Sequence, residues 1–457
     1  MKKIFILALA SLSLHSCHIY EKYERPDNLP TKGLYRNVNE ANADTVNFGN
    51  KAWREVFTDP LLQDLIQKAL QQNTNMQEAD LTILQAEQGY KISRLAFLPQ
   101  LALSPQGTLT SWDFGKATQV YNIPVSASWQ IDAFGSLRNA KKQSEMSLMQ
   151  ARIAKQAVQT SIIANVANLY YTLVMLDEQL NTTKSTITLW EDNVRTMEAM
   201  AEAAMTNFAA VAQAKANLME SKASVPALEQ NIQQTENALS VLLHEAPHSI
   251  ARAASLSSES FPASMSVGVP LQLLTNRPDV RIAEYKLAYA FYGVQKAHSA
   301  FYPQITISGQ AGWTNNSGMG LVNPGKILSS AVGSIVQPLF MKGQLTANLK
   351  ISKAQQEIAT LDFEQALLNA GQEVSNALTS YQTAISKAEI RTQEVEKLQE
   401  AKERTLDLFK YTNTTSYLET LTAQQSLLNA QLSLINDNYS KVQAIINLYA
   451  ALGGGRE

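Results

Sequence analysis

The sequence is poor in residues that interrupt regular structure. It has 19 glycines and 14 prolines among 457 residues, about 7% of the chain against a usual total of roughly 12%. Charged side chains make up 17%, below the usual value of roughly 25%. The 38 basic and 40 acidic residues leave a formal charge of −2. Few breakers predict long uninterrupted elements, and the lack of a basic excess argues against nucleic-acid binding.

A single cysteine, Cys17, excludes an internal disulfide and a cysteine-based metal cluster. It follows Lys2, Lys3 and an apolar run over residues 4–14, which is the order of a secretory signal. We expect residues 1–16 to be a signal peptide that resembles a bacterial lipobox, and Cys17 to carry a covalent lipid such as palmitate. The alternative is an ordinary signal peptide with a chance cysteine. Removing the two lysines changes the formal charge from −2 to −4.

Long hydrophobic runs are also missing. No stretch after the signal reaches the ~18 uninterrupted apolar residues of a membrane-spanning helix. The longest candidate, residues 162–176, is interrupted by Asn165 and Asn168. An exported chain that crosses a membrane without such a helix must do so as a barrel of strands.

The chain contains two similar halves. Residues 73–103 align without gaps with residues 277–307, at an offset of 204 (277 minus 73). Later matches in the two halves lie at offsets of 208 to 209, so one unit occurs twice. We therefore expect a signal peptide, a lipidated tether, a first repeat, a linker and a second repeat, over residues 1–16, 17–50, 51–250, 251–270 and 271–457.

Each half has the same predicted order of elements. A helix (about 60–97, then about 278–301) precedes two alternating segments, and a long helical region in two pieces follows. A helix over about 137–204 would extend roughly 100 Å. Second pieces at about 209–244 and 416–452 complete two helical hairpins.

The long helices carry a heptad pattern, with apolar residues spaced by three and four. This spacing predicts left-handed coiled-coil packing. In the first half the positions are Ile162, Val166, Leu169, Leu173, Leu176, Leu180, Thr183, Ile187, Trp190, Val194, Met197 and Ala201. In the second half they are Leu367, Ala370, Val374, Ala377, Tyr381, Ala384, Ala388, Arg391, Val395 and Leu398.

Four short segments alternate apolar and polar residues. Two lie within about 100–131 and two within about 304–338. Alternating segments of about ten residues are typical of outer-membrane barrel strands. Trp112, Trp129 and Trp313 lie in or at the ends of these segments, as expected for an interfacial girdle. A soluble β-sandwich with one wet face is the alternative, and the export signal favours the membrane.

Four strands cannot close a membrane barrel by themselves, because the smallest such barrels have about eight strands. An open sheet in lipid would leave unpaired edges. We therefore expect an oligomer whose subunits pool their strands, with the long helices continuing the wall as a coiled-coil tube.

Four segments of the sequence resemble the TolC/OprM family of outer-membrane efflux channels, in its lipoprotein branch often called NodT-like. The resemblance covers nearly the whole mature chain and rests on residues 53–73, 132–135 (DAFG), 273–284 (LLTNRPDVRIAE) and 301–303 (FYP). It implies an α+β membrane protein: a trimer whose 12-stranded transmembrane β-barrel takes four strands from each chain and continues into a long periplasmic α-helical barrel.

The resemblance also implies partners. They are two further copies of the chain, outer-membrane lipid, a periplasmic adaptor protein and an inner-membrane transporter. The hairpin tips, as candidate adaptor contacts, fall at Ala204 and Asn207 in the first half and at Asn413 and Thr415 in the second. Family members commonly carry glycine at the tips. Asparagine tolerates the left-handed conformation that glycine supplies, whereas alanine does so poorly.

Three residues shortly before the second tip, Arg404, Asp407 and Tyr411, are candidates for a periplasmic gate. The resemblance implies that charged and tyrosine side chains near this end constrict the closed tube. A trimer repeats each charge three times around the axis, which builds rings that can open. The alternative is that these side chains lie on a solvated outer face.

Two other motifs favour structural roles. Arg277, Pro278 and Asp279 open a helix after a loop, where Asp279 suits the helix dipole and the exposed amides. Residues 244–248 (HEAPH) match the zinc motif H-E-x-x-H, but Pro247 would break the helix that the motif requires. We predict no metal site.

The sequence shows no catalytic constellation and no phosphate-binding loop. We therefore expect no enzymatic activity and no cofactor except the lipid on Cys17, with energy supplied by partners. The predicted function is the outer-membrane channel of a tripartite efflux system, a passive exit duct for small molecules such as drugs or other toxic compounds. The alternative is a periplasmic coiled-coil lipoprotein that acts as an adaptor or structural spacer, which needs no lipid-facing strands.

Overall fold

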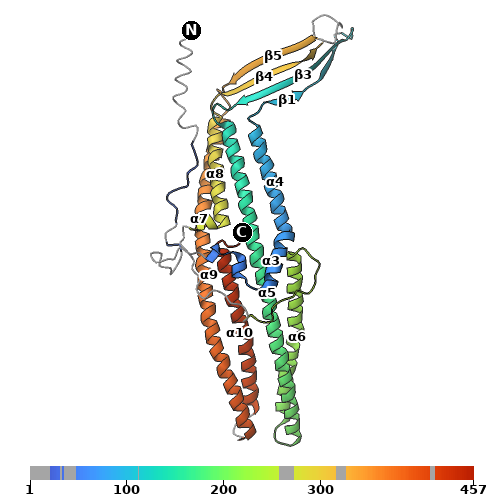
Figure 1. Cartoon of the computed structure of the whole chain (residues 1–457), viewed down its shortest axis with the longest axis vertical. Coiled ribbons are helices and arrows are strands. Elements are labelled where there is room, and N and C mark those ends of the chain that lie inside the picture. The colour runs from blue at the N-terminus through green and yellow to red at the C-terminus, as the bar shows by residue number, and fades with distance from the viewer. Residues whose placement is uncertain are drawn as a thin grey trace. The chain divides into compact units, whose positions relative to one another are not determined.

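A computed structural model describes residues 21–30, 33–34, 48–111, 113–256, 272–314, 326–411 and 417–456. Helices and strands follow one another as shown in Figure 1. In chain order they are η3 (Phe48–Asn50), α2 (Trp53–Val56), α3 (Pro60–Gln72), α4 (Thr74–Leu95), β1 (Gln100–Leu103), β2 (Gln106–Thr110), β3 (Thr118–Ile131), α5 (Ser136–Glu202), α6 (Phe208–Leu242), α7 (Leu273–Asn276), α8 (Pro278–Ser299), β4 (Gln304–Thr314), β5 (Lys326–Val336), α9 (Gln344–Tyr411) and α10 (Tyr417–Ala451).

The chain divides into two compact units. The first contains the sheet with Leu81–Ile153 and Ile282–Gln365, and the second contains Ala154–Arg281 and Ala366–Glu457. Both predicted repeats contribute segments to each unit. The hairpins α5–α6 and α9–α10 match the predicted helical pieces to within about two residues at the ends that were predicted.

The first unit is built on one antiparallel sheet. β3 pairs with β4 over ten residue pairs, from Asn122–Thr314 to Ile131–Ile305, and β4 pairs with β5. β1 and β2 both pair with β3, one after the other along the same strand. The sheet is therefore four strands wide, as predicted.

The first predicted strand is not continuous. Ser104 and Pro105 separate β1 from β2, where proline lacks the N–H that a ladder requires. The Ser104 amide still donates to the carbonyl of Pro124 at 3.1 Å, so the chain keeps its place beside β3 across the break.

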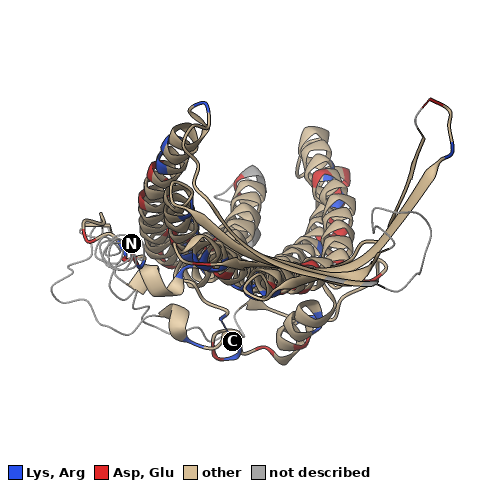
Figure 2. Ribbon diagram, turned by 90° about the horizontal axis from the view of Figure 1, so that it is seen from above, with Lys and Arg blue, Asp and Glu red and all other residues tan. Residues whose placement is uncertain are grey.

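Charge is nearly absent from the strands. Figure 2 shows Lys, Arg, Asp and Glu on the helices and loops, whereas the strands are almost entirely of other residues. Lys326 is the one charged residue within the bounds of β1 to β5. An uncharged sheet fits an environment in which ionised side chains are costly.

The heptad prediction is confirmed in the second unit. Every predicted heptad position of α5 and α9 is buried or half-buried. Near the first hairpin tip, Trp190, Val194 and Met197 of α5 pack with Val211 and Leu218 of α6, and Leu421 of α10 joins the same cluster. Coiled-coil spacing thus builds both the hairpin and its contact with α10.

The predicted helix over about 60–97 is broken at Asn73, so that expectation was wrong in detail. Asn73 has an extended backbone (φ −61°, ψ 132°) and ends α3. Its side chain accepts a hydrogen bond from the Asn75 amide (2.9 Å) and donates to the Leu242 carbonyl (2.8 Å). These bonds replace the helical ones that the kink removes.

The two hairpins end in equivalent ways. After α10, the Gly454 amide bonds to the Tyr449 carbonyl (3.0 Å), and Gly453 has φ +78°. After α6, the Glu245 amide bonds to the Ser240 carbonyl (2.9 Å), and His244 has φ +59°. Both are left-handed helix caps. The H-E-x-x-H match is therefore a cap beyond the end of α6, and its histidines do not share a helix face.

No helix in the described part of the chain is both long enough and apolar enough to span a membrane.

Candidate functional site: a two-faced sheet and the ends of the hairpins

The strand register gathers apolar side chains on one face of the sheet. Residues directly opposite in an antiparallel pair share a face. Ile123 lies opposite Trp313, Trp129 opposite Ile307, and Trp313 opposite Ile327. These side chains are 39% to 75% exposed. In the described residues no second sheet covers this face, which disfavours the sandwich alternative.

Tryptophans mark two levels of that apolar face. Trp313 and Trp129 lie at positions six residues apart along β4, because Trp129 is opposite Ile307. This separation is about 20 Å at the rise of an extended strand. The Trp129 indole donates to the Phe97 carbonyl at 2.8 Å. Rings at two levels with aliphatic side chains between them are typical of the lipid-facing band of outer-membrane strands. Trp112 lies outside the described residues.

The opposite face of the sheet carries hydroxyl and amide side chains. Ser126 lies opposite Gln310, and Gln310 lies opposite Ser330. Ser128 lies opposite Ser308, one step along the same face. Such a face can contact water continuously, because each group can donate or accept a hydrogen bond. The sheet therefore separates an apolar environment from an aqueous one.

The junction of β3 with α5 is fixed by the predicted DAFG segment. Asp132 caps α5 by accepting hydrogen bonds from the amides of Leu137 (2.9 Å) and Arg138 (2.8 Å). Gly135 has φ +77°, a conformation that favours glycine. The Phe134 ring stacks on Tyr302 with centroids 5.1 Å apart. These contacts tie the end of β3 to the segment between α8 and β4.

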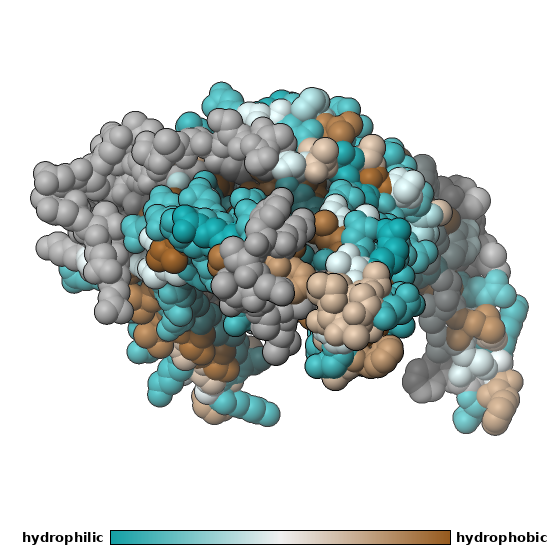
Figure 3. Space-filling view, turned by 90° about the horizontal axis from the view of Figure 1, so that it is seen from below, coloured by the Kyte–Doolittle hydropathy of each residue, from teal (hydrophilic) through white to brown (hydrophobic). Residues whose placement is uncertain are grey.

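The first hairpin tip is a tight turn that uses alanine where glycine would be unstrained. Ala204 has φ +58°. Asn207 caps α6, because its side chain accepts a hydrogen bond from the Ala210 amide at 2.9 Å. Met205 and Phe208 beside them are 66% and 75% exposed. Figure 3 looks at the molecule from below and shows separate apolar patches in a largely hydrophilic surface.

The second tip is only partly described. Asn413 and Thr415 lie outside the described residues, and Tyr411 is the last residue of α9. Arg404 forms an ion pair with Glu400 on its own helix, and Asp407 is exposed. The gate assignment of Arg404, Asp407 and Tyr411 stays a prediction.

Arg277 ties three elements of the second unit together. Its guanidinium binds both carboxylate oxygens of Asp279 (2.9 and 2.6 Å) and Glu373 of α9 (2.6 Å). It also donates to the Ala451 carbonyl of α10 at 3.0 Å. Burial by itself would lower the pKa of Arg277, but the bonds from Asp279 and Glu373 outweigh it, so the pKa lies above its usual value. Pro278 begins α8. All the contacts are internal, in keeping with the structural role predicted for Arg277 and Asp279.

Sequence reasoning missed a buried charge cluster. Arg252 binds Asp177 of α5 (2.5 and 3.0 Å) and Glu236 of α6 (2.5 Å). The Ala253 amide donates to the Tyr170 hydroxyl at 2.9 Å. The cluster fastens the segment after α6 onto the hairpin. Its members are 16 to 75 residues apart, and no local pattern links them. Among the described residues no group of three or more His, Cys, Asp or Glu could hold a metal ion.

The profile of the family described as "Outer membrane efflux protein" matches residues 65–244 and 269–454. The chain belongs to this family. It is similar to the cation efflux system protein CusC of Escherichia coli K12, with 27% identity over 97% of this chain and 98% of that protein. It is also 26% identical to the probable outer membrane lipoprotein SilC of Salmonella typhimurium, over 100% of this chain and 99% of that protein.

Solved structures agree with the sequence relatives. A crystal structure of CusC, described in terms of transmembrane channel formation, superposes with a TM-score of 0.84 at 25% identity and covers 95% of this chain and 99% of that one. The open state of the Neisseria gonorrhoeae MtrE outer membrane channel gives 0.84 at 25%, over 96% and 98%. The chain is thus an outer-membrane channel of an efflux system, and the predicted family, function and location are confirmed.

Proposed function

We propose that three copies of the chain form a passive exit duct for small molecules, with a 12-stranded barrel continued by the helices of the two repeats. The observation that carries the proposal is the sheet itself. It has one apolar and one polar face, and its edge strands β5 and β1–β2 each pair on one side only within the described chain. Unpaired edges are costly in lipid, and joining the edges of three copies removes them.

Two exposed apolar stripes in the first unit support lateral association of the copies. On α4 the stripe is formed by Leu81, Leu84, Ile92 and Leu95, each more than half exposed. On α9 it is formed by Ile351, Ile358 and Leu361, also more than half exposed. The spacings of three and seven residues are those of coiled-coil contacts. Under the proposal, α4 of one copy packs against α9 of the next.

The remaining parts of the proposal concern partners and anchoring. A periplasmic adaptor contacts the hairpin tips at Ala204, Asn207, Asn413 and Thr415, and an inner-membrane transporter supplies energy. The chain itself performs no catalysis and uses no cofactor. The covalent lipid on Cys17 holds the N-terminal tether in the outer membrane. Uncharged hydroxyl and amide groups on the polar face suit an unselective duct.

The substrate class is proposed from the relatives. Their names refer to cations for CusC, to toluene and antibiotics for two Pseudomonas putida proteins, and to solvents for a third. These cargoes share small size rather than charge. We propose small toxic molecules as the cargo of this chain.

Planar-bilayer conductance of the detergent-extracted protein, with its mass determined in the same detergent, tests the duct. A trimer that gives discrete current steps is expected. A soluble monomer or dimer without membrane activity would instead support the adaptor or spacer alternative. With Asp407→Ala, basal conductance rises if Asp407 lines the gate, and unchanged conductance places it on the outer wall.

Cross-linking tests the packing of α4 against α9. Leu84→Cys combined in turn with Ile351→Cys, Ile358→Cys or Leu361→Cys should give a covalent trimer ladder on mild oxidation for at least one pair. Each single variant is the matched control and should give no ladder, which also accounts for Cys17. A trimer by mass without any cross-linked pair would refute this arrangement of helices.

A further inference from the structure

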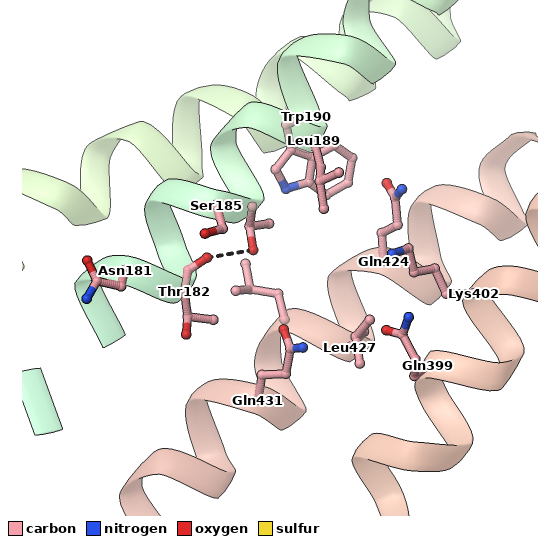
Figure 4. Close-up of a pocket in the computed structure, with 12 residues that line it drawn as sticks. Asn181, Thr182, Ser185, Leu189, Trp190, Gln399, Lys402, Gln424, Leu427 and Gln431 are labelled. Carbon is pink, nitrogen blue, oxygen red and sulfur yellow. Dashed lines mark hydrogen bonds between the residues drawn. The ribbon is translucent and has the colours of Figure 1, made fainter. Parts of the chain in front are cut away.

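A cavity of about 340 Å³ lies between the two helical hairpins in the second unit. Figure 4 shows α5 on one side of it and helices of the other hairpin opposite. Side chains from α5, α9 and α10 line it, including Leu189, Trp190, Lys402, Leu427 and Leu428. Its volume is within the range of small-molecule sites, roughly 300–1,000 Å³. Nothing in the channel proposal uses this cavity.

A buried donor without a partner faces this cavity. The Trp190 side chain is 1% exposed, and its Nε1–H has no hydrogen-bond partner among the described residues. Figure 4 shows the nitrogen-bearing edge of the indole turned toward the hollow. Buried polar groups are nearly always hydrogen-bonded, and an indole N–H can only donate. A molecule that satisfies Trp190 must therefore bring an acceptor.

The second donor is a lysine from the other hairpin. Lys402 of α9 is half-buried, and in Figure 4 its side chain extends toward Gln424 of α10. No aspartate or glutamate is among the described residues that line the cavity. Leu189, Leu427, Leu428 and the Trp190 ring provide an apolar wall. The cavity thus combines a positive charge, an unpaired N–H donor and apolar surface.

We propose that this cavity binds small amphiphilic carboxylates. The carboxylate supplies two acceptor oxygens and a negative charge that complements Lys402, and the apolar body packs against the leucines and the indole. Because the lining comes from both hairpins, the bound molecule contacts α5 and α9–α10 at once. The site is separate from the transport wall and does not depend on conduction.

Equilibrium dialysis of 4-phenylbutyrate against the full-length protein in a non-ionic detergent tests the site. One saturable site per chain is expected, and the neutral 4-phenylbutanamide should bind at least tenfold more weakly. Lys402→Met should weaken 4-phenylbutyrate binding about tenfold, because it removes the charge that complements the carboxylate. Trp190→Phe should weaken it about fivefold, which corresponds to one lost hydrogen bond.

Lys397→Met is the matched control. Lys397 is on the same helix, but its side chain is 80% exposed and is paired with Glu400 at 3.1 Å. This variant should bind as the wild type does. Far-UV circular dichroism and the mass of the oligomer establish that each variant is folded. No saturable binding to the wild type would overturn the proposal, as would equal binding of the amide or no effect of Lys402→Met in a folded variant. A closed or inactive channel leaves the dialysis result unaffected.

Discussion

The guanidinium of Arg277 donates a hydrogen bond to the carbonyl of Ala451, 3.0 Å away and 174 residues later in the chain. Ala451 is the last residue of α10, where carbonyl oxygens lack partners within the helix. Arg277 therefore closes the end of one helix, while Asp279 and Glu373 balance its charge. A single buried side chain joins the start of α8, the middle of α9 and the end of α10.

Replacing Arg277 should destabilise the helical unit. Arg277→Met removes the Ala451 bond and leaves two carboxylates without their cation, at a cost of about 2 kcal/mol. The thermal midpoint of the detergent-extracted protein should fall clearly below that of the wild type. Arg404→Met, which removes an exposed arginine paired within one turn of α9, is the control and should leave the midpoint unchanged. Equal midpoints for both variants would contradict the role of Arg277.

Ala204→Gly should stabilise the first hairpin. Ala204 has φ +58°, and a left-handed conformation costs an L-residue with a Cβ roughly 1 kcal/mol. The gain is partly offset because glycine is freer in the unfolded chain, so about 0.5 kcal/mol is expected. Hydrogen exchange of amides at the end of α5 reports the change.

Ala203→Gly is the neighbouring control for Ala204→Gly. Ala203 is not among the residues with positive φ, so glycine there only adds freedom to the unfolded chain and should speed exchange. Slower exchange in both variants would mean that the backbone strain at Ala204 is not the cause.

Asp437 gives a pH dependence to the second hairpin. It accepts hydrogen bonds from Lys387 (2.9 Å) and Arg391 (3.2 Å) of α9. Burial by itself would raise the pKa of Asp437, but the two cations outweigh it, so the pKa lies below the usual value. Stability from a lowered carboxylate pKa is complete above the unfolded pKa of about 3.9 and is lost as the pH falls through the folded pKa.

Asp437→Asn should therefore lower the thermal midpoint at pH 7 and lose this disadvantage as the pH falls below about 4. Thermal midpoints of both proteins from pH 7 down to pH 3 measure the effect. A difference that stays constant across this range would assign the loss to something other than the charge of Asp437.

The two faces of the sheet should respond differently to one charge. Ala311 lies on the apolar face opposite Val125, and Gln310 lies on the polar face opposite Ser126. Ala311→Lys should cost about 2–4 kcal/mol of barrel stability, because lysine would face lipid. Gln310→Lys should assemble normally and shift the channel toward anions. Heat-stable trimer on a gel and reversal potentials in a salt gradient distinguish the two. Equal assembly of both variants would contradict the assignment of the faces.

Cys17→Ala should separate delivery from assembly. Without the lipid, less protein should reach the outer membrane, while the purified trimer should still form because strands and helices hold it together. Membrane fractionation and mass in detergent measure the two effects. Ser16→Ala keeps a small residue before the cleavage point and should behave as the wild type. Loss of the trimer in Cys17→Ala would show that the anchor contributes to assembly.

Local patterns account for most of the predicted fold. Alternation predicted β3 and β4, and heptad spacing predicted burial from Ile162 to Ala201, because side-chain direction follows directly from backbone geometry. Position along the chain also placed the first tip at Ala204 and Asn207. The break at Asn73 escaped prediction, because its side chain bonds to Leu242 far along the chain.

The sequence by itself determined the length of the helices, the alternation of the strands and the family of the chain, all of which depend on neighbours a few residues apart. Only the tertiary structure decided which side chains far apart in sequence meet. It placed Arg277 on Ala451 and Arg252 between Asp177 and Glu236. It also left the Trp190 N–H facing a cavity shared with Lys402. Long-range contacts depend on how whole helices pack, and no periodicity in the chain records them.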